Sequence, residues 1–234
     1  MPRIRTFATL GLLSIFALVF AAPAAAAAPP TLMTLLGPAA NDNLGRSVAG
    51  AGDFNGDGYD DVVVGVPNRD LAGTDAGAAY VYFGGPGADE TPDLPLLGAA
   101  AGDYFGFGVA GAGDVNGDGY DDVVVGAYGN DAGGGAAGRA YVYFGGATPN
   151  AVADLTVTGA AASDYFGWSV AGAGDVNHDG YADWIVGAYG NDGGAANAGR
   201  AYVYLGGASP DNVADVTLTG EAAGDWFGYA VAGA

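Results

Sequence analysis

The nine-residue pattern D-[FV]-N-x-D-G-Y-x-D occurs three times in this chain, and each copy begins 61 residues after the previous one. The copies are Asp53–Asp61, Asp114–Asp122 and Asp175–Asp183. An internal period of this length indicates a repeat architecture, in which one supersecondary unit is stacked several times. The content of one unit therefore decides the fold class.

Each unit contains four short segments typical of β-strands: a run of small residues, a valine-rich run, an aromatic run and a short alternating run. Examples are residues 166–173, 122–127, 140–145 and 154–158. Clusters of Gly, Asn and Asp separate them, and no window beyond the N-terminal leader has sustained helical periodicity. The second and third segments are apolar on both faces, so their sheet needs cover on both sides. We predict an all-β fold, a β-propeller of four-stranded antiparallel blades with the small residues innermost, rather than an array of β-sandwiches.

The first 28 residues have the composition of a signal peptide. Arg3 and Arg5 form a basic region, residues 7–22 are apolar, and small residues at 24–28 allow cleavage. A membrane anchor is the alternative, because the apolar stretch is nearly long enough to span a bilayer, but Pro23 and the alanine run favour cleavage. We expect a secreted or cell-surface protein without a transmembrane span after cleavage.

The charge of the chain is strongly negative. It has 26 acidic residues, of which only two are Glu, against six Arg and no Lys, and its formal net charge is −20. Such a surface repels phosphate backbones, so nucleic acid is excluded as a partner. Aspartate is the residue of tight turns and calcium loops, and nine of the aspartates lie in the three repeated loops. Because an exported chain without cysteine has no disulfides, bound metal is the expected staple.

The repeated loops carry the oxygen donors of a calcium site. Side chains at positions 1, 3, 5 and 9 converge with the backbone carbonyl of position 7, and Gly at position 6 permits the bend. Hard oxygen donors in this number favour Ca²⁺ over Mg²⁺ or Zn²⁺. Position 12 is Val and a strand follows, so the loop is not an EF-hand and the Asp at position 9 takes over. The alternative is a set of metal-free turns, in which three carboxylates repel one another. The three predicted sites comprise Asp53, Asn55, Asp57, Tyr59 and Asp61; Asp114, Asn116, Asp118, Tyr120 and Asp122; and Asp175, Asn177, Asp179, Tyr181 and Asp183.

The residues around the loops resemble the FG-GAP repeat. The pattern F-G-x-S-V-A-G-A-G-D-x-N-x-D-G, seen in full at residues 166–180, is followed by a strand and by G-A-Y or G-V-P. The GAP positions are Gly65-Val66-Pro67, Gly126-Ala127-Tyr128 and Gly187-Ala188-Tyr189, of which only the first keeps Pro. The resemblance runs from residue 32 to the end. It implies the N-terminal propeller of integrin α chains and of many bacterial exported proteins, a seven-bladed ring that needs about 430 residues at this period.

The period divides the chain into units. Residues 32–98 hold a leading strand and the first blade, 99–159 the second blade, 160–220 the third, and 221–234 begin a fourth. The leading strand, at residues 32–36, is similar to the last strand of a blade. We therefore expect a partial propeller of about three blades plus flanking strands.

The repeats differ at the residue after the FG pair, where Arg46, Phe107, Trp168 and Tyr229 stand. In an antiparallel blade this position lies on the face opposite the calcium loops, near the mouth of the channel. Each side chain could simply fill a gap in its own blade. As an aromatic rim, the set suits a cationic side chain or a sugar ring of a partner. The resemblance implies that in integrins this face receives a partner subunit and ligand, so we expect an extracellular or cell-surface protein or glycan as partner.

The sequence favours a non-catalytic adhesion or protein-interaction module over an enzyme. It has one His, no Lys and no G-x-S-x-G, whereas acid–base catalysis needs titratable groups outside the metal loops. The alternatives are the propeller part of a secreted carbohydrate-active or other hydrolytic enzyme whose catalytic region is missing from this chain, and a mere spacer. We expect His178 to be a solvated loop residue, Trp184 to be core, and Arg139 and Arg200 to pair with local carboxylates.

Overall fold

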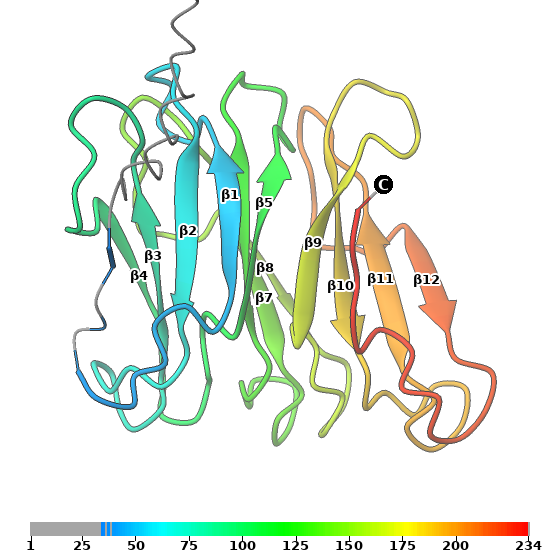
Figure 1. Cartoon of the computed structure of the whole chain (residues 1–234). Helices are drawn as coiled ribbons and strands as arrows, with labels where there is room; N and C mark the ends of the chain where they lie inside the picture. The colour runs from blue at the N-terminus through cyan, green and yellow to red at the C-terminus, as the bar shows by residue number, and fades with distance from the viewer. Residues whose placement is uncertain (1–33, 36, 38, 234) are drawn as a thin grey trace, which may run out of the picture. The chain divides into compact units, whose positions relative to one another are not determined.

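Twelve β-strands form the regular secondary structure of the computed structural model, which describes residues 34, 35, 37 and 39–233 (Figure 1). The predicted signal peptide lies outside these residues. So does most of the predicted leading strand, of which Thr34 and Leu35 are described and are not in a strand. The described part of the chain contains no helix, as expected, and hence none of the length and hydropathy that a membrane span requires.

The strands form three antiparallel sheets of four, each from strands consecutive in the chain. We call them blade 1 (β1–β4), blade 2 (β5–β8) and blade 3 (β9–β12). The bounds are Val48–Gly52 (β1), Asp61–Val66 (β2), Ala78–Tyr82 (β3), Leu94–Leu97 (β4), Gly108–Gly113 (β5), Asp122–Ala127 (β6), Arg139–Tyr143 (β7), Leu155–Thr158 (β8), Ser169–Gly174 (β9), Asp183–Ala188 (β10), Arg200–Tyr204 (β11) and Val216–Thr219 (β12). The prediction of four-stranded antiparallel blades is confirmed.

The valine-rich strands are covered on both faces, as their composition requires. Every residue of β6 is buried. Val123 and Val125 belong to a core cluster with Val63 of blade 1, whereas Val124 belongs to a second cluster with Trp184 of blade 3. Alternate side chains of one strand therefore enter two different cores, because successive residues of a strand point to opposite faces.

The small-residue strands β1, β5 and β9 lie against one another almost backbone to backbone. A Cβ atom added to Gly111 would come within 2.5 Å of the carbonyl oxygen of Gly50, and one added to Gly172 within 2.6 Å of that of Gly111. No side chain larger than hydrogen fits at these two positions. This close approach explains why the first strand of each unit is written almost entirely in Gly, Ala and Val.

The phenylalanine of each FG pair joins its blade to the preceding one. Phe105 and Phe166 are 1% and 2% exposed. Parallel bridges pair Gly77 with Phe105, Gly138 with Phe166 and Gly199 with Phe227. The small-residue strand accordingly starts at Ser169, three residues later than the predicted 166, because Phe166 pairs with the neighbouring blade instead of its own.

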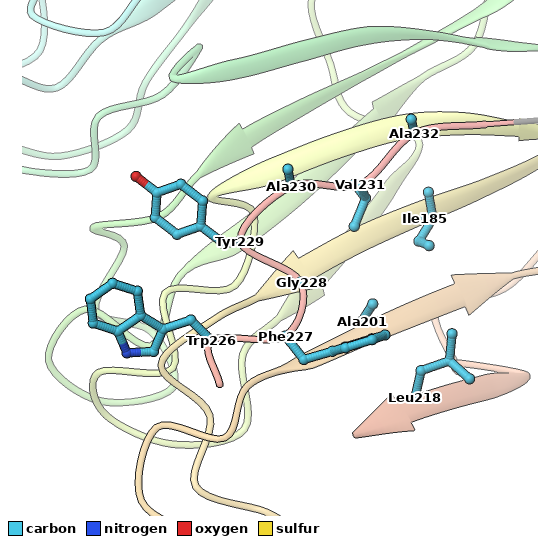
Figure 2. Close-up of a pocket in the computed structure, with 10 residues that line it drawn as sticks. All are labelled: Ile185, Ala201, Leu218, Trp226, Phe227, Gly228, Tyr229, Ala230, Val231 and Ala232. Carbon is cyan, nitrogen blue, oxygen red and sulfur yellow. The ribbon is translucent and has the colours of Figure 1, made fainter. Parts of the chain in front are cut away.

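The last described segment repeats this arrangement against blade 3. Figure 2 shows Phe227 beside Ala201 of β11 and directed toward Leu218 of β12, next to a cavity of about 340 Å³. Trp226 and Tyr229 extend away from Leu218. The segment therefore contacts blade 3 as the FG segments of blades 2 and 3 contact their predecessors.

The connections between strands gather at two edges (Figure 1). The loops after β1, β5 and β9, which carry the repeated acidic pattern, lie along one edge, and the loops after β2, β6 and β10 lie along the other. This is the placement that antiparallel order predicts. It separates the two candidate sites by the length of a strand.

Candidate calcium loops and aromatic ribbon

Each acidic loop winds around the carboxylate at its first position. In the loop of blade 2, Asp114 accepts hydrogen bonds from the backbone N–H groups of Gly117, Asp118 and Gly119 at 2.7, 3.1 and 2.8 Å. Gly119 has φ = +92°, a conformation that favours glycine and that the sharp bend at position 6 requires. The sequence expectation for this glycine is met.

Positions 3 and 5 form a second layer of the loop. The Asn116 side-chain oxygen accepts the N–H of Asp118 at 2.8 Å, and Asp118 accepts the N–H of Tyr120 at 3.0 Å. The pairs Asn55–Asp57 and Asn177–Asp179 repeat these bonds. The side-chain oxygens of positions 1, 3 and 5 are thus gathered by the amides of their own loop.

The aspartate at position 9 ties the loop to the blade. Asp122 is fully buried; one carboxylate oxygen accepts the N–H of Val115 at 2.8 Å and the other accepts the N–H of Gly145, beyond the end of β7, at 2.9 Å. Asp61 and Asp183 make the corresponding bonds. A carboxylate has about four acceptor sites, so these bonds leave capacity for a cation. Sequence reasoning assigned this residue to the metal and missed its role in holding the loop.

The loops have no cationic partner in the protein. Burial, with repulsion from Asp118 and Asp114, raises the pKa of Asp122 to about 7 although two N–H bonds oppose the shift. Burial is also the largest cause of the raised pKa of Asp61. The one ion pair in the described part of the chain joins Arg69 and Asp42 at 2.9 Å, away from every loop.

The donor set fits a calcium ion. The Oδ1 atom of Asp53 is buried and has no hydrogen-bond partner among the described residues, which is costly for a carboxylate oxygen unless a cation satisfies it. Together with the amide of Asn55 and the carboxylate of Asp57 it offers hard oxygen donors, which suit Ca²⁺ and not Zn²⁺. In the described conformation no three acidic or imidazole side chains have the spacing of a metal site. The oxygens must therefore turn from their amides toward an ion, and calcium binding stays a prediction.

The four predicted rim residues lie in one row at the opposite edge. The guanidinium carbon of Arg46 lies 4.2 Å from the centre of the Phe107 ring. Ring centres are 4.4 Å apart between Phe107 and Trp168, and 5.6 Å apart between Trp168 and Tyr229. Residues that are separated by whole repeats thus form a continuous surface.

Two tyrosines that sequence reasoning did not include complete this row. Tyr128 lies 4.6 Å from Phe107 and 4.9 Å from Trp168, and Tyr189 lies 4.9 Å from Trp168 and 5.3 Å from Tyr229. Both end a G-A-Y triplet, where the first repeat has proline. The aromatic ribbon consists of Phe107, Tyr128, Trp168, Tyr189 and Tyr229. The signal that could have found the two tyrosines is that they, like the rim residues, differ from the first repeat.

A second row of rings supports the ribbon from below. Tyr104 stacks on Tyr128 at 5.0 Å and Tyr165 stacks on Tyr189 at 5.1 Å, with nearly parallel planes. Burial raises the pKa of Tyr128 to about 12, so its hydroxyl stays protonated at physiological pH. The ribbon therefore presents neutral rings.

The remaining singled-out residues have local roles. His178 is exposed, with Nδ1 3.0 Å from the backbone oxygen of Asp175. Trp184 is fully buried, which confirms the prediction of a core residue. The prediction of carboxylate pairing is wrong for Arg139, whose Nε donates to the Thr158 hydroxyl at 2.9 Å and whose guanidinium lies over a tyrosine ring. Arg200 likewise makes no ion pair with a described carboxylate, since the neighbouring strand offers threonine at this position.

Known proteins share this repeat. The FG-GAP repeat matches residues 44–82, 105–143 and 166–204, which together are half of the chain. Among curated proteins, integrin alpha-IIb of Mus musculus is 39% identical over 163 residues and integrin alpha-5 of Xenopus laevis 32% identical over 172 residues. These alignments cover 63% and 69% of this chain but only 15% and 16% of the relatives, so the chain spans a small part of their length. The chain belongs to the FG-GAP repeat family, and its blades resemble those of the integrin α propeller.

Proposed function

We propose that this chain is an exported, calcium-stabilised and non-catalytic module for adhesion or protein interaction. The observation that carries the proposal is the separation of two surfaces: three acidic loops on one edge and an aromatic ribbon on the other. The similarity to integrin α chains and the signal-like leader support it. The partner is an extracellular or cell-surface protein or glycan.

The acidic loops have a structural task in this proposal. In blade 2 the ion is held by the side chains of Asp114, Asn116, Asp118 and Asp122 and by the carbonyl of Tyr120. Bound calcium supplies positive charge to a cluster of carboxylates that has no basic partner. The loop residues then keep the end of each blade ordered, because the position-9 aspartate joins the loop to the third strand.

The aromatic ribbon has the task of recognition. The contact of Arg46 with Phe107 is an internal example of a guanidinium on a ring of this surface. Tyr229, which is 51% exposed, offers the most accessible ring of the row. A partner's Arg or Lys gains both ring contact and attraction from a protein of net charge −20, and a sugar ring can stack on the same faces.

Calcium titration tests the loops. We expect isothermal titration calorimetry to give three sites with dissociation constants of about 10⁻⁴ to 10⁻³ M, the range of extracellular modules. Asp57→Ala, Asp118→Ala and Asp179→Ala should each remove one site, because each deletes the carboxylate at position 5. His178→Ala is the matched control, since it alters a loop without removing a ligand. A titration of the wild-type chain without calcium heat would refute the sites.

Substitution of Trp168 tests the ribbon. A partner is first captured from cell-surface and matrix proteins and identified, and its dissociation constant is measured by surface plasmon resonance. Trp168→Ala should weaken binding by more than about tenfold, because it removes the ring at the centre of the row. Tyr59→Ala is the control: it removes a ring that is 49% exposed at the calcium edge and should bind normally. If the control abolishes binding and Trp168→Ala does not, the partner uses the calcium edge.

A further inference from the structure

The acidic loops of neighbouring blades are joined by the same backbone contacts at both junctions. Between blades 1 and 2, the N–H of Asp121 lies 3.4 Å from the backbone oxygen of Asp53, and that of Gly146 donates to Phe54 at 2.8 Å. Between blades 2 and 3, the equivalent distances are 3.0 Å from Ala182 to Asp114 and 2.9 Å from Gly207 to Val115. A tyrosine ring also covers a glycine of the preceding loop at each junction, Tyr120 on Gly56 and Tyr181 on Gly117.

One side chain distinguishes the two junctions. The carboxylate of Asp121 accepts the backbone N–H of Asp53 at 2.8 Å and lies so close to Gly52 that no Cβ atom fits there. At the second junction the residue in this place is Ala182. No hydrogen bond to the backbone N–H of Asp114 is found among the described residues. The bond between the Asp121 carboxylate and the Asp53 amide, which we call the clasp, thus occurs once, and the protein contains its own unclasped junction for comparison.

The clasp connects two calcium loops. Asp53 is the first predicted ligand of the loop in blade 1, and the clasp holds its backbone. Asp121 stands between Tyr120 and Asp122, the position-7 and position-9 ligands of the loop in blade 2. Any ordering of the second loop therefore orders the acceptor that holds the first ligand of the first loop.

We propose that Asp121 is a positioning residue that couples the calcium sites of blades 1 and 2, whereas the sites of blades 2 and 3 lack this coupling. The proposal rests on the calcium-binding function above. Filling the site in blade 2 raises the affinity of the site in blade 1, and linkage makes the effect reciprocal. The site in blade 3 fills independently of the clasp.

The first test needs no calcium. Amide hydrogen exchange of Asp53 and Asp114 is measured by NMR in excess EDTA on the full chain and on Asp121→Ala, Asp121→Asn and Ala182→Asp. Loss of the acceptor in Asp121→Ala should accelerate exchange at Asp53 by about tenfold or more, and Ala182→Asp should slow exchange at Asp114 by a similar factor. Asp121→Asn, which keeps an oxygen acceptor, should stay near wild type. Equal exchange at Asp53 in wild type and Asp121→Ala would overturn the clasp.

The second test adds calcium and follows each loop by its own NMR signals. In Asp121→Ala the site in blade 1 should weaken by about fivefold or more, with the site in blade 3 unchanged. Asp121→Asn should keep the wild-type affinity; a loss with the Asp53 amide still protected would assign the effect to charge and overturn the positioning role. Unchanged affinities in Asp121→Ala would overturn the coupling. Absence of calcium binding in every variant would refute the proposed sites, and with them the coupling, while the exchange data would still decide whether the clasp exists.

Discussion

Removal of calcium by excess EDTA should lower the melting temperature by about 10 °C. An ion present at ten times its dissociation constant stabilises the folded chain by about 1.4 kcal/mol per site, and three sites contribute ~4 kcal/mol. For a domain of this size each kcal/mol corresponds to roughly 2–4 °C. The acidic loops have no basic partner to replace the ion. Differential scanning calorimetry in calcium and in EDTA measures the shift.

The matched control is the triple variant Asp57→Ala, Asp118→Ala and Asp179→Ala, which has lost one ligand from each loop. Its melting curve should be the same in calcium and in EDTA. Because the blades contact only their neighbours, the single variants should lose the calcium response in steps. A wild-type melting curve that EDTA leaves unchanged would show that the loops are plain turns.

Trp184→Ala should reduce the free energy of unfolding by about 3–5 kcal/mol, the usual cost of truncating a buried tryptophan. The indole is fully buried between blades 2 and 3 and stacks on Tyr204 with ring centres 4.1 Å apart. The corresponding residues Val62 and Val123 are smaller, so this junction has been packed around the larger ring. Urea denaturation monitored by circular dichroism gives the value.

Trp226→Ala is the control for that experiment, because the Trp226 side chain is 53% exposed. Its effect on unfolding should stay within about 0.5 kcal/mol. Equal costs for the two tryptophan variants would contradict the assignment of Trp184 to the core between blades. The comparison also separates a loss of packing from a general effect of removing tryptophan.

The strands and their order could be predicted because one unit is written three times. The valine-rich strand was expected at residues 122–127 and is found there. Apolar residues on both faces of that strand required two covering neighbours, and Val123 and Val124 enter two different cores. Both inferences need only the pattern within a strand and the physical demand for cover.

Contacts between units could not be predicted in the same way. Tyr128 lies 67 residues from the start of the first run of the ribbon's period at Asp61, and nothing local to its G-A-Y triplet indicates that it contacts Trp168. The two bonds of Asp122 are similarly hidden, because a carboxylate in an acidic loop can serve an ion, an amide or both. Only the fold shows that Gly145 comes within reach of it.

The repeated pairing of an FG phenylalanine with a glycine of the preceding blade has a genetic consequence. Gly77 receives Phe105 as Gly138 receives Phe166, so the surfaces at the two junctions are interchangeable. Deletion of residues 105–165, one whole period, would bring Phe166 directly after Tyr104 and within reach of Gly77. A deletion of any other length would place a turn residue against that glycine. Unequal recombination between copies can thus shorten or lengthen the array without creating a new interface, and only in steps of one blade.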